Sequence, residues 1–371
     1  MTSEPAATVG PVLIIGSGLL GASIGLALTA LGVSVRIRDA SPVAQALARD
    51  LGAGELDAPG AEPPTLVVVA TPPDVTAGIV GSALHTFPRA VVTDVASVKG
   101  VILEELRDFA TLDLSRYVGS HPMAGREKSG ASAATGELFA GRPWVICAHE
   151  DADPAAVLAV RNLAGDLGGA PAYLGAREHD DAVALVSHMP QLVASLVAAR
   201  LLEAPEPALG LAGQGVRDLT RIAASDAKLW TAIITGNASS VRTVMRELRD
   251  DLDGLLEALD RAAEDGPLAV GAMHGIAGVI SAGNDGVGRI PGKHGGARKR
   301  YTEVIVLVPD QPGELGRLFG EVGEIGVNIE DFAMEHSPKQ KVGMAIVSVV
   351  PAAAQQLEDA LTERGWRVVS A

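Results

Sequence analysis

The sequence predicts an α/β protein with a doubly wound parallel sheet, followed by an all-helical region and a small βαββαβ unit. Three observations predict this architecture. Short aliphatic runs alternate with helix-length segments over residues 11–176, helical spacing of apolar residues continues for roughly 100 residues, and strand-like runs return after residue 300. We therefore expect a first domain over 8–176, a helical domain over 177–282, a linker over 283–300 and a last domain over 301–371.

The predicted strands of the first domain are mostly continuous apolar runs, which is typical of strands covered by helices on both faces. They cover residues 12–15, 33–38, 66–70, 90–94, 117–120, 144–147 and 172–174. Helices are expected between them, for example over 18–31, 42–51 and 154–167. Because aromatic residues make up only 3% of a chain with 43 glycines, the core must be aliphatic and closely packed.

Length and composition limit the class of protein. A chain of 371 residues that is 47% hydrophobic and 20% charged can bury sizeable cores in two or three domains. A net charge of −15 argues against nucleic acid as a partner. The single cysteine, Cys147, can form neither an intrachain disulfide nor a zinc site, so no metal is expected. With no signal peptide and no uninterrupted apolar window of about 20 residues, we expect a cytoplasmic protein without a membrane span.

The motif GSGLLG lies between a predicted strand and a predicted helix. Gly16 permits a tight turn, Gly18 lets a pyrophosphate approach the backbone, and Gly21 lets helix and strand pack closely. Asp39 closes the second predicted strand, where a carboxylate would accept hydrogen bonds from an adenosine ribose. The alternative is a glycine turn in an α/β fold that binds no ligand. The predicted cofactor-binding residues are Gly16, Ser17, Gly18, Leu19, Leu20, Gly21, Asp39, Thr71, Pro72 and Ser97.

Asp39 also bears on the choice of cofactor. A carboxylate at this position repels a 2′-phosphate, so NAD is favoured over NADP. Arg36 and Arg38 lie close in the sequence and could weaken that preference.

Polar residues follow three later strands, at the sheet edge where open α/β sheets bind ligands. Thr71 and Pro72 follow the strand over 66–70, Ser97 follows 90–94, and His121 follows 117–120. A neutral imidazole accepts a hydroxyl proton near physiological pH, so His121 is the candidate general base. Ser97 could bond either His121 or a substrate. The alternatives are a helix-capping serine and a histidine satisfied by backbone groups.

The apolar helix expected over 181–200 carries a polar stripe. Asp181, His188, Gln191 and Ser195 recur at spacings of seven, three and four. Such a stripe either lines a ligand pocket or bonds another helix. We expect Pro190 to kink this helix.

Five ordered motifs over about residues 10–280 resemble prephenate and arogenate dehydrogenases of tyrosine biosynthesis. They are GSGLLGAS, TDVASVKG, GSHPMAGREKSG with LFAGRPW, HDDAVALVSHMP, and RDLTRIAASDAKLW. The resemblance implies NAD-dependent oxidative decarboxylation of prephenate to 4-hydroxyphenylpyruvate, with His121 as the catalytic histidine beside Ser97. It also implies a Rossmann-type first domain and a helical domain that forms a homodimer.

The resemblance further implies a substrate-binding set. Arg221 matches the substrate-binding arginine, with Arg217 and Asp218 near it on one helix, although a surface ion-pair network is the alternative reading. The other predicted members are His179, His188, Gln191 and Glu127. Gln191 departs from the family, because many members carry a second histidine there. Preference for prephenate over arogenate therefore stays open.

The residues after 280 divide into a Gly-rich basic stretch and a βαββαβ pattern. Strands are expected over 301–308, 327–336, 342–350 and 366–370, with helices over 313–325 and 351–364. The run VLVPDQPGELGRLFGEVGEIGVNIEDF resembles an ACT-type regulatory domain. The resemblance implies that Gly313 and Asn328 bind an aromatic amino acid effector, with tyrosine as the expected one. The alternative is a tail that only dimerises.

Two further alternatives are an amino acid sensor without activity and a hydroxyacid dehydrogenase of another family. A catalytically silent amino acid sensor conflicts with the intact His121, Ser97 and Arg221. A different two-domain hydroxyacid dehydrogenase would depend on a lysine in the helical domain, where residues 177–280 hold only Lys228.

Overall fold

The computed structural model describes residues 5–109, 112–125, 130–291, 301–336 and 342–369. The chain forms two compact units, residues 1–248 and 249–371, which divide inside helix α11 (Ala238–Glu264). The predicted boundary between residues 176 and 177 falls within the first of these units. Asp180, just after that position, accepts the backbone N–H groups of Lys99 and Gly100 in the sheet domain.

One eight-stranded sheet organises the first unit, in the order β3-β2-β1-β4-β5-β6-β7-β8. Its strands are β1 Val12–Ile15, β2 Val35–Arg38, β3 Glu55–Leu56, β4 Leu66–Val69, β5 Val91–Asp94, β6 Tyr117–Pro122, β7 Pro143–Cys147 and β8 Ala170–Tyr173. The seven predicted strands are confirmed; the two-residue β3 was too short to leave a signal. The order reverses between β1 and β4, which is the switch point at which such sheets bind ligands.

The prediction of an entirely parallel sheet is wrong at one place. β7 pairs antiparallel with β6, whereas the other neighbouring strands pair in parallel. A parallel neighbour requires a crossover connection, usually a helix, that returns the chain to the starting edge. Between these two strands the described residues form only the short 3₁₀ turn η2 (Ala131–Ala133), and the Met123 N–H already bonds the Pro143 carbonyl at 2.8 Å.

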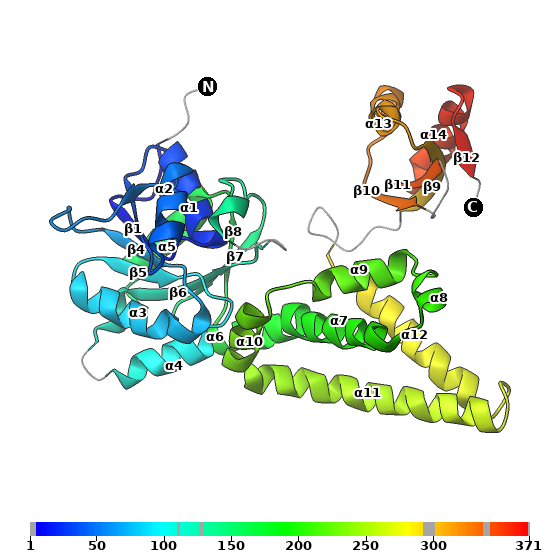
Figure 1. Cartoon of the computed structure of the whole chain (residues 1–371), viewed down its shortest axis with the longest axis horizontal. Coiled ribbons are helices and arrows are strands. Elements are labelled where there is room, and N and C mark those ends of the chain that lie inside the picture. Colours follow the sequence, from blue (N-terminus) through cyan, green and yellow to red (C-terminus); the bar gives the residue numbers. More distant parts are fainter. Residues whose placement is uncertain (1–4, 110–111, 126–129, 292–300, 337–341, 370–371) are drawn as a thin grey trace. The chain divides into compact units, whose positions relative to one another are not determined.

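Helices cover both faces of the sheet. The helices are α1 Leu19–Ala30, α2 Pro42–Asp50, α3 Pro73–Thr86, α4 Gly100–Asp108 and α5 Pro154–Asp166. α1 and α5 cover one face and α3 and α4 the other (Figure 1). Local sequence sets several starts: Ser41 and Asp153 each cap a helix whose first residue is a proline.

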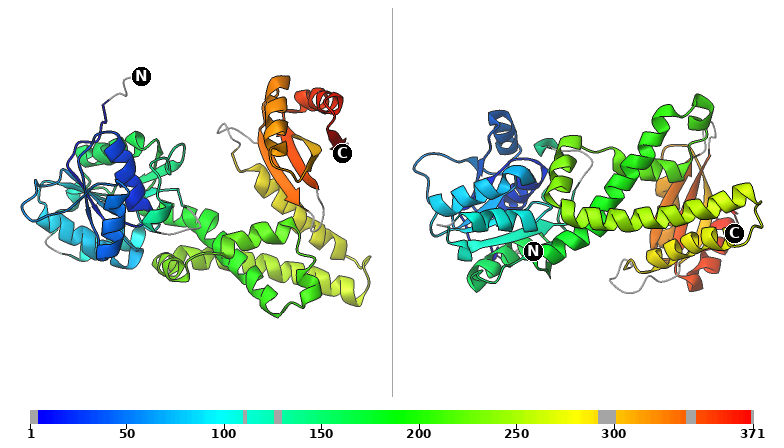
Figure 2. Two further views of the ribbon diagram at one scale, coloured as in Figure 1. Left: turned by 45° about the horizontal axis from the view of Figure 1, so that its top comes forward. Right: turned by 90° about the horizontal axis from the view of Figure 1, so that it is seen from below.

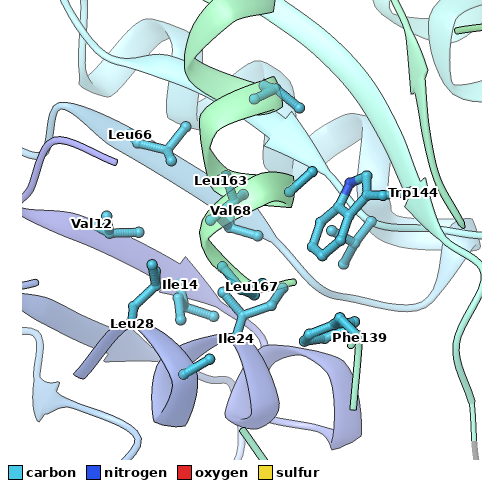
Figure 3. Packing of buried hydrophobic residues seen from close by; sticks show 14 of the residues in the cluster. Val12, Ile14, Ile24, Leu28, Leu66, Val68, Phe139, Trp144, Leu163 and Leu167 are labelled. Carbon is cyan, nitrogen blue, oxygen red and sulfur yellow. The ribbon is translucent and has the colours of Figure 1, made fainter. Parts of the chain in front are cut away.

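The larger core lies between the sheet and the pair α1 and α5. Val12, Ile14 and Val68 from the strands meet Ile24 and Leu28 of α1, with Leu163 of α5 among them (Figure 3). The rings of Phe139 and Trp144 close this core, with centroids 5.1 Å apart. The aliphatic character expected from composition is thus what holds the sheet against its helices.

A run of helices completes the first unit. It consists of α6 Ala176–Val183, the π-helical turn η3 Ala184–His188, α7 Met189–Arg200, the 3₁₀ turn η4 Leu201–Glu203, α8 Glu206–Leu209, α9 Gln214–Ala223 and α10 Ala227–Gly236. The irregularity expected at Pro190 takes the form of η3, which ends two residues before the proline. Proline cannot fit a regular helix, because its ring clashes with the carbonyl four residues earlier, so a widened turn accommodates it.

The helix from Ala176 to Glu203 is long and apolar enough, by length and composition, to cross a membrane. Asp181, Pro190 and Arg200 interrupt the apolar run of this helix, as the sequence predicts. His179, Asp180 and His188 of this helix are buried and hydrogen-bonded within the first unit.

In the second unit, α12 (Ala272–Gly288) packs on the end of α11. The predicted linker over 283–300 is wrong for its first six residues, because α12 continues to Gly288. Residues 292–300 lie outside the described part of the chain. Tertiary packing overrides the poor helix propensity of glycine here: a Cβ at Gly275 would lie 2.7 Å from the Ala258 Cβ. Figure 2 shows α11 itself as one long helix.

The predicted βαββαβ pattern is confirmed. Its elements are β9 Thr302–Pro309, α13 Glu314–Ile325, β10 Asp331–His336, β11 Val342–Val349, α14 Pro351–Glu363 and β12 Arg367–Val369. The sheet is antiparallel with the order β10-β11-β9-β12. Val304 and Val306 face Leu318 of α13 and Leu357 of α14, so the two helices share one core with the sheet.

Close approach of α1 to the chain after α2 gives a test of the fold. A Cβ at Gly25 would lie 2.1 Å from the Ala53 carbonyl oxygen, whereas a Cβ at Gly78 on α3 meets nothing within 4 Å. We expect Gly25→Ala to lower the free energy of unfolding by about 1–3 kcal/mol through overpacking. Gly78→Ala should raise it by about 0.5–1 kcal/mol, because alanine loses less backbone entropy. Denaturant unfolding measures both, and equal effects would contradict the packing.

Candidate functional site

A cavity of about 610 Å³ opens at the carboxyl ends of β1, β4, β5 and β6. Each strand delivers one part of its lining: Gly18 follows β1, Thr71 follows β4, Ser97 follows β5, and His121 lies at the end of β6. The remaining wall comes from the helices, with His188 of η3 and Trp230 of α10. Residues far apart in sequence meet here because parallel strands end at the same sheet edge.

The glycine turn fits a dinucleotide. Gly16 has a positive φ of 103°, and a Cβ there would lie 2.4 Å from the Ala70 carbonyl oxygen. A Cβ at Gly21 would lie 1.9 Å from the Gly16 carbonyl oxygen, so helix and turn approach as the motif predicts. At Gly18, by contrast, a Cβ meets nothing within 4 Å. That open space lies at the N-terminus of α1, where backbone N–H groups and the helix dipole attract a pyrophosphate.

Asp39 braces this turn. Its carboxylate accepts hydrogen bonds from the Ser17 N–H at 2.6 Å, the Ser17 hydroxyl at 2.7 Å and the Ser41 N–H at 2.8 Å. Burial works to raise the pKa of Asp39, but these hydrogen bonds outweigh it and lower the pKa. A carboxylate offers about four acceptor positions, so one remains for a ribose hydroxyl. Arg36 and Arg38 both bind the carboxylate of Asp57 rather than that of Asp39.

His121 is held from behind by a second histidine. Its Nδ1 lies 2.8 Å from His179 Nε2, and His179 Nδ1 lies 2.8 Å from Asp180 Oδ1. His121 is half-buried, and His179 is fully buried. Burial lowers the pKa of His121 well below its usual value, and the neighbouring His179, Lys99 and His188 lower it further. His121 is therefore neutral at physiological pH, as a general base must be.

His188 faces the cavity from η3. Its Nδ1 lies 3.2 Å from Nδ2 of Asn237, and its ring meets Trp230 edge to face. An amide nitrogen only donates, so His188 Nδ1 accepts and the ring proton sits on Nε2. Burial lowers the pKa of His188 to about 4, although Asp180 acts in the opposite direction. The helix thus offers the cavity a neutral donor.

The structure brings most of the predicted residues together. Those that line the cavity are Gly18, Leu19, Leu20, Thr71, Pro72, Ser97, His121 and His188. Gly16, Ser17 and Gly21 lie beneath them in the buried turn. Ser97 and His121 both line the cavity. The Nδ1 atom of His121 bonds His179.

Four predicted substrate-binding residues do not line the cavity. His179 lies behind His121, and the Gln191 amide donates to the Ser225 hydroxyl at 2.8 Å. Arg217 and Arg221 are exposed on α9. Asp181, the first member of the expected polar stripe, is also exposed and accepts from Ser240 at 2.7 Å, because the π turn rotates it away from His188. Glu127 lies outside the described residues.

Three important residues escaped the sequence reasoning. Asp180 follows His179 in the HDD motif, but the motif does not indicate that the side chain of Asp180 is buried. Asn237 donates both to the Asp180 carbonyl at 2.7 Å and toward His188, and an asparagine at a helix junction carries no sequence signal for this. Trp230 supplies a cavity wall from α10.

Comparison with known proteins adds the family. Residues 24–172 match the profile of the prephenate dehydrogenase nucleotide-binding domain, and residues 175–270 match that of the prephenate dehydrogenase dimerization domain. A probable prephenate dehydrogenase, NovF of Streptomyces niveus, is 38% identical over 95% of this chain and 98% of its own. The chain belongs to the prephenate dehydrogenase family. A cyclohexadienyl dehydrogenase of Zymomonas mobilis is 30% identical over 69% of this chain and 89% of its own.

Solved structures agree with this membership in the prephenate dehydrogenase family. The prephenate dehydrogenase of Aquifex aeolicus, solved with hydroxyphenyl propionate and NAD⁺, matches with a TM-score of 0.64 and 28% identity, over 74% of this chain and 97% of that one. These findings confirm the predicted enzyme class, an oxidoreductase of the prephenate dehydrogenase type, and the NAD cofactor. The C-terminal βαββαβ unit begins after both family profiles end.

The low pKa of His188 makes stability depend on pH. The folded state keeps His188 neutral down to about pH 4, whereas the unfolded chain binds that proton near pH 6.5. The stabilisation is therefore complete above pH 6.5 and is lost as the pH falls toward 4, by roughly 2–3 kcal/mol. Chemical unfolding at several pH values should show a shallower acid loss in His188→Gln than in the wild type. Parallel curves for the two proteins would contradict a buried neutral His188.

Proposed function

We propose that the protein catalyses the NAD-dependent oxidative decarboxylation of prephenate to 4-hydroxyphenylpyruvate in tyrosine biosynthesis. One observation carries this proposal: a neutral, half-buried His121 shares one cavity with the glycine turn of a dinucleotide site. A base and a hydride acceptor beside each other suit oxidation of a ring hydroxyl. The homologues named prephenate dehydrogenase support the choice of substrate.

The reaction can be followed through the residues of this chain. The N-terminus of α1 and the Gly18 turn hold the pyrophosphate, and Asp39 holds the adenosine ribose. NAD, when bound, supplies the hydride acceptor. His121 accepts the proton of the ring hydroxyl at Nε2, and Ser97 is placed to orient that hydroxyl. Loss of the ring carboxylate as CO₂ leaves an aromatic product, so one base suffices.

The wall that α10 contributes to the cavity is apolar and suits the ring of a substrate. Leu229, Trp230 and Ile233 of α10 face the cavity, which places apolar surface opposite the polar sheet edge. Prephenate is a dianion and needs cationic partners. Among the cavity residues that the structure describes, none is a lysine or arginine. We therefore retain Arg221 of α9, with Arg217 near it, as the proposed carboxylate partner, since arginine pairs with carboxylates through two parallel hydrogen bonds.

Arogenate remains the second candidate substrate. His188 is neutral and Gln191 cannot become cationic, so neither opposes the amino group of arogenate. The relative named cyclohexadienyl dehydrogenase is consistent with a broader substrate range.

Steady-state assays of prephenate and arogenate, each with NAD and NADP, test this function. We expect prephenate with NAD to give the highest kcat/KM. His121→Asn should lower kcat by about 10²–10⁴-fold, the usual contribution of a general base, while NAD binding is retained. His85→Asn, on the exposed end of α3, is the matched control and should behave as the wild type. Full activity in His121→Asn, or no turnover of either substrate by the wild type, would refute the proposal.

We also propose that the C-terminal unit binds an aromatic amino acid, with tyrosine as the effector. The βαββαβ fold and the position of Gly313 at the start of α13, with a positive φ of 93°, support an open helix N-terminus for a carboxylate. The Asn328 amide lies nearby in the chain and donates to Glu330 at 2.7 Å. The alternative is a unit that only contributes to assembly.

Inhibition of the full-length enzyme by tyrosine tests this role. Loss of one hydrogen bond to a charged ligand costs about 1.5–3 kcal/mol, so Asn328→Ala should raise the inhibitory tyrosine concentration by about tenfold or more. Gln355→Ala removes an amide from the surface of α14 and serves as the control. Unchanged inhibition in Asn328→Ala would assign the effector to another site.

We propose further that the enzyme is a cytoplasmic homodimer. The family profile for dimerization covers residues 175–270, and the helices of this stretch expose large apolar side chains. Leu185 and Leu196 of the long helix are each more than half exposed, which is costly unless a second copy covers them. The net charge of −15 continues to argue against nucleic acid as a partner.

A further inference from the structure

Two backbone N–H groups hold the carboxylate of Asp180 in place, in addition to its contact with a histidine. Its Oδ1 accepts the Lys99 N–H at 2.9 Å and its Oδ2 accepts the Gly100 N–H at 2.7 Å, at the start of α4. A helix N-terminus stabilises a negative charge. Asp180 is therefore an acceptor on every side, and His179 Nδ1, 2.8 Å from Oδ1, has to carry a proton.

That proton fixes the rest of the chain of hydrogen bonds. A neutral imidazole with its proton on Nδ1 has a lone pair on Nε2, so His179 Nε2 accepts from His121 Nδ1 at 2.8 Å. His121 Nδ1 then holds the only proton of its ring. Its Nε2 is left with a free lone pair, and His121 lines the cavity.

We propose that Asp180 and His179 are positioning residues that lock His121 in the one neutral tautomer able to accept a proton from the cavity. The inference deepens the proposed function and rests on it. It also replaces the expected substrate-binding role of His179, whose side chain is fully buried behind His121.

The charges around His121 suit this role. His179 faces it from α6 and bonds Asp180, and His188 faces it from η3 and bonds Asn237. The Lys99 ammonium, from the β5 side, is paired with buried Asp94, which also accepts from the Tyr117 hydroxyl at 2.7 Å. The fixed charges next to the pair of histidines thus cancel, except for Asp180. When His121 takes up a substrate proton, the new positive charge is stabilised through His179 by that carboxylate.

Three variants test whether Asp180 and His179 fix the tautomer of His121, an effect called the lock below. In Asp180→Asn with the NH₂ group at the position of Oδ1, the oxygen keeps the Gly100 N–H and the Lys99 N–H loses its acceptor. The NH₂ group then donates to His179 Nδ1, so both histidines adopt the opposite tautomer. We expect kcat to fall by about 10²-fold or more, with KM and NAD affinity within about threefold of the wild type. His179→Gln places an oxygen where Nε2 was and should retain kcat within about tenfold, whereas His179→Leu should lose it as Asp180→Asn does.

Asp181→Asn is the matched control, because Asp181 is the exposed neighbour on the same helix and its carboxylate accepts a hydrogen bond from Ser240 at the surface. It should leave kcat unchanged. A purely structural role would lower the melting temperature in His179→Gln and His179→Leu alike and would not separate their kcat values. Equal kcat in these two variants, or wild-type kcat in Asp180→Asn, would overturn the inference.

A substrate-free measurement separates this inference from the proposed reaction. In ¹⁵N spectra of the full-length protein, His121 of the wild type should show an unprotonated Nε2 and a protonated Nδ1, and Asp180→Asn should exchange the two signatures. The same tautomer in both proteins would overturn the lock. A wild type that shows the tautomer but oxidises neither prephenate nor arogenate would refute the function and leave the lock standing.

Discussion

The site depends on where the carboxylate of Asp180 is held. This one side chain bonds the first N–H groups of α4 on the sheet domain and at the same time bonds His179 on its own helix. The helix that carries Ser187 and His188 of the cavity wall is thereby fixed to the chain after β5, which carries Ser97. A buried carboxylate is costly unless it is fully hydrogen-bonded, so the contact specifies a single arrangement of helix and sheet.

The charges around the cavity suit a neutral base. Inside the described site His121 and His188 are neutral, and the buried ammonium of Lys99 is paired with Asp94. The chemistry there needs an uncharged base more than it needs a cation, because a protonated His121 could not accept a proton. Arg221, the proposed partner of a substrate carboxylate, is exposed on α9, where solvent lowers the cost of keeping an arginine charged.

Local irregularities place the functional groups. The π turn η3 ends at His188, just before Pro190, and it is this widened turn that lets His188 face the cavity while Asp181 points outward. The antiparallel return of β7 beside β6 similarly supports the end of the strand that carries His121. Both features arise from backbone constraints, the missing N–H of proline and a loop without a crossover helix.

The sequence by itself determined the parts of the protein that depend on local pattern. Strand and helix periodicity, the GSGLLG turn, Asp39 after β2 and His121 at the end of β6 all follow from residues close together in the chain. Only the tertiary structure decided which polar residues meet. His179 and Gln191 lie on the same helix as His188, yet His179 bonds His121 and Gln191 bonds Ser225. Asp180 and Asn237 join this hydrogen-bond network although no sequence motif indicates it. The reason is that spacing along a helix fixes a face, whereas burial and hydrogen-bond partners are supplied by elements tens of residues away.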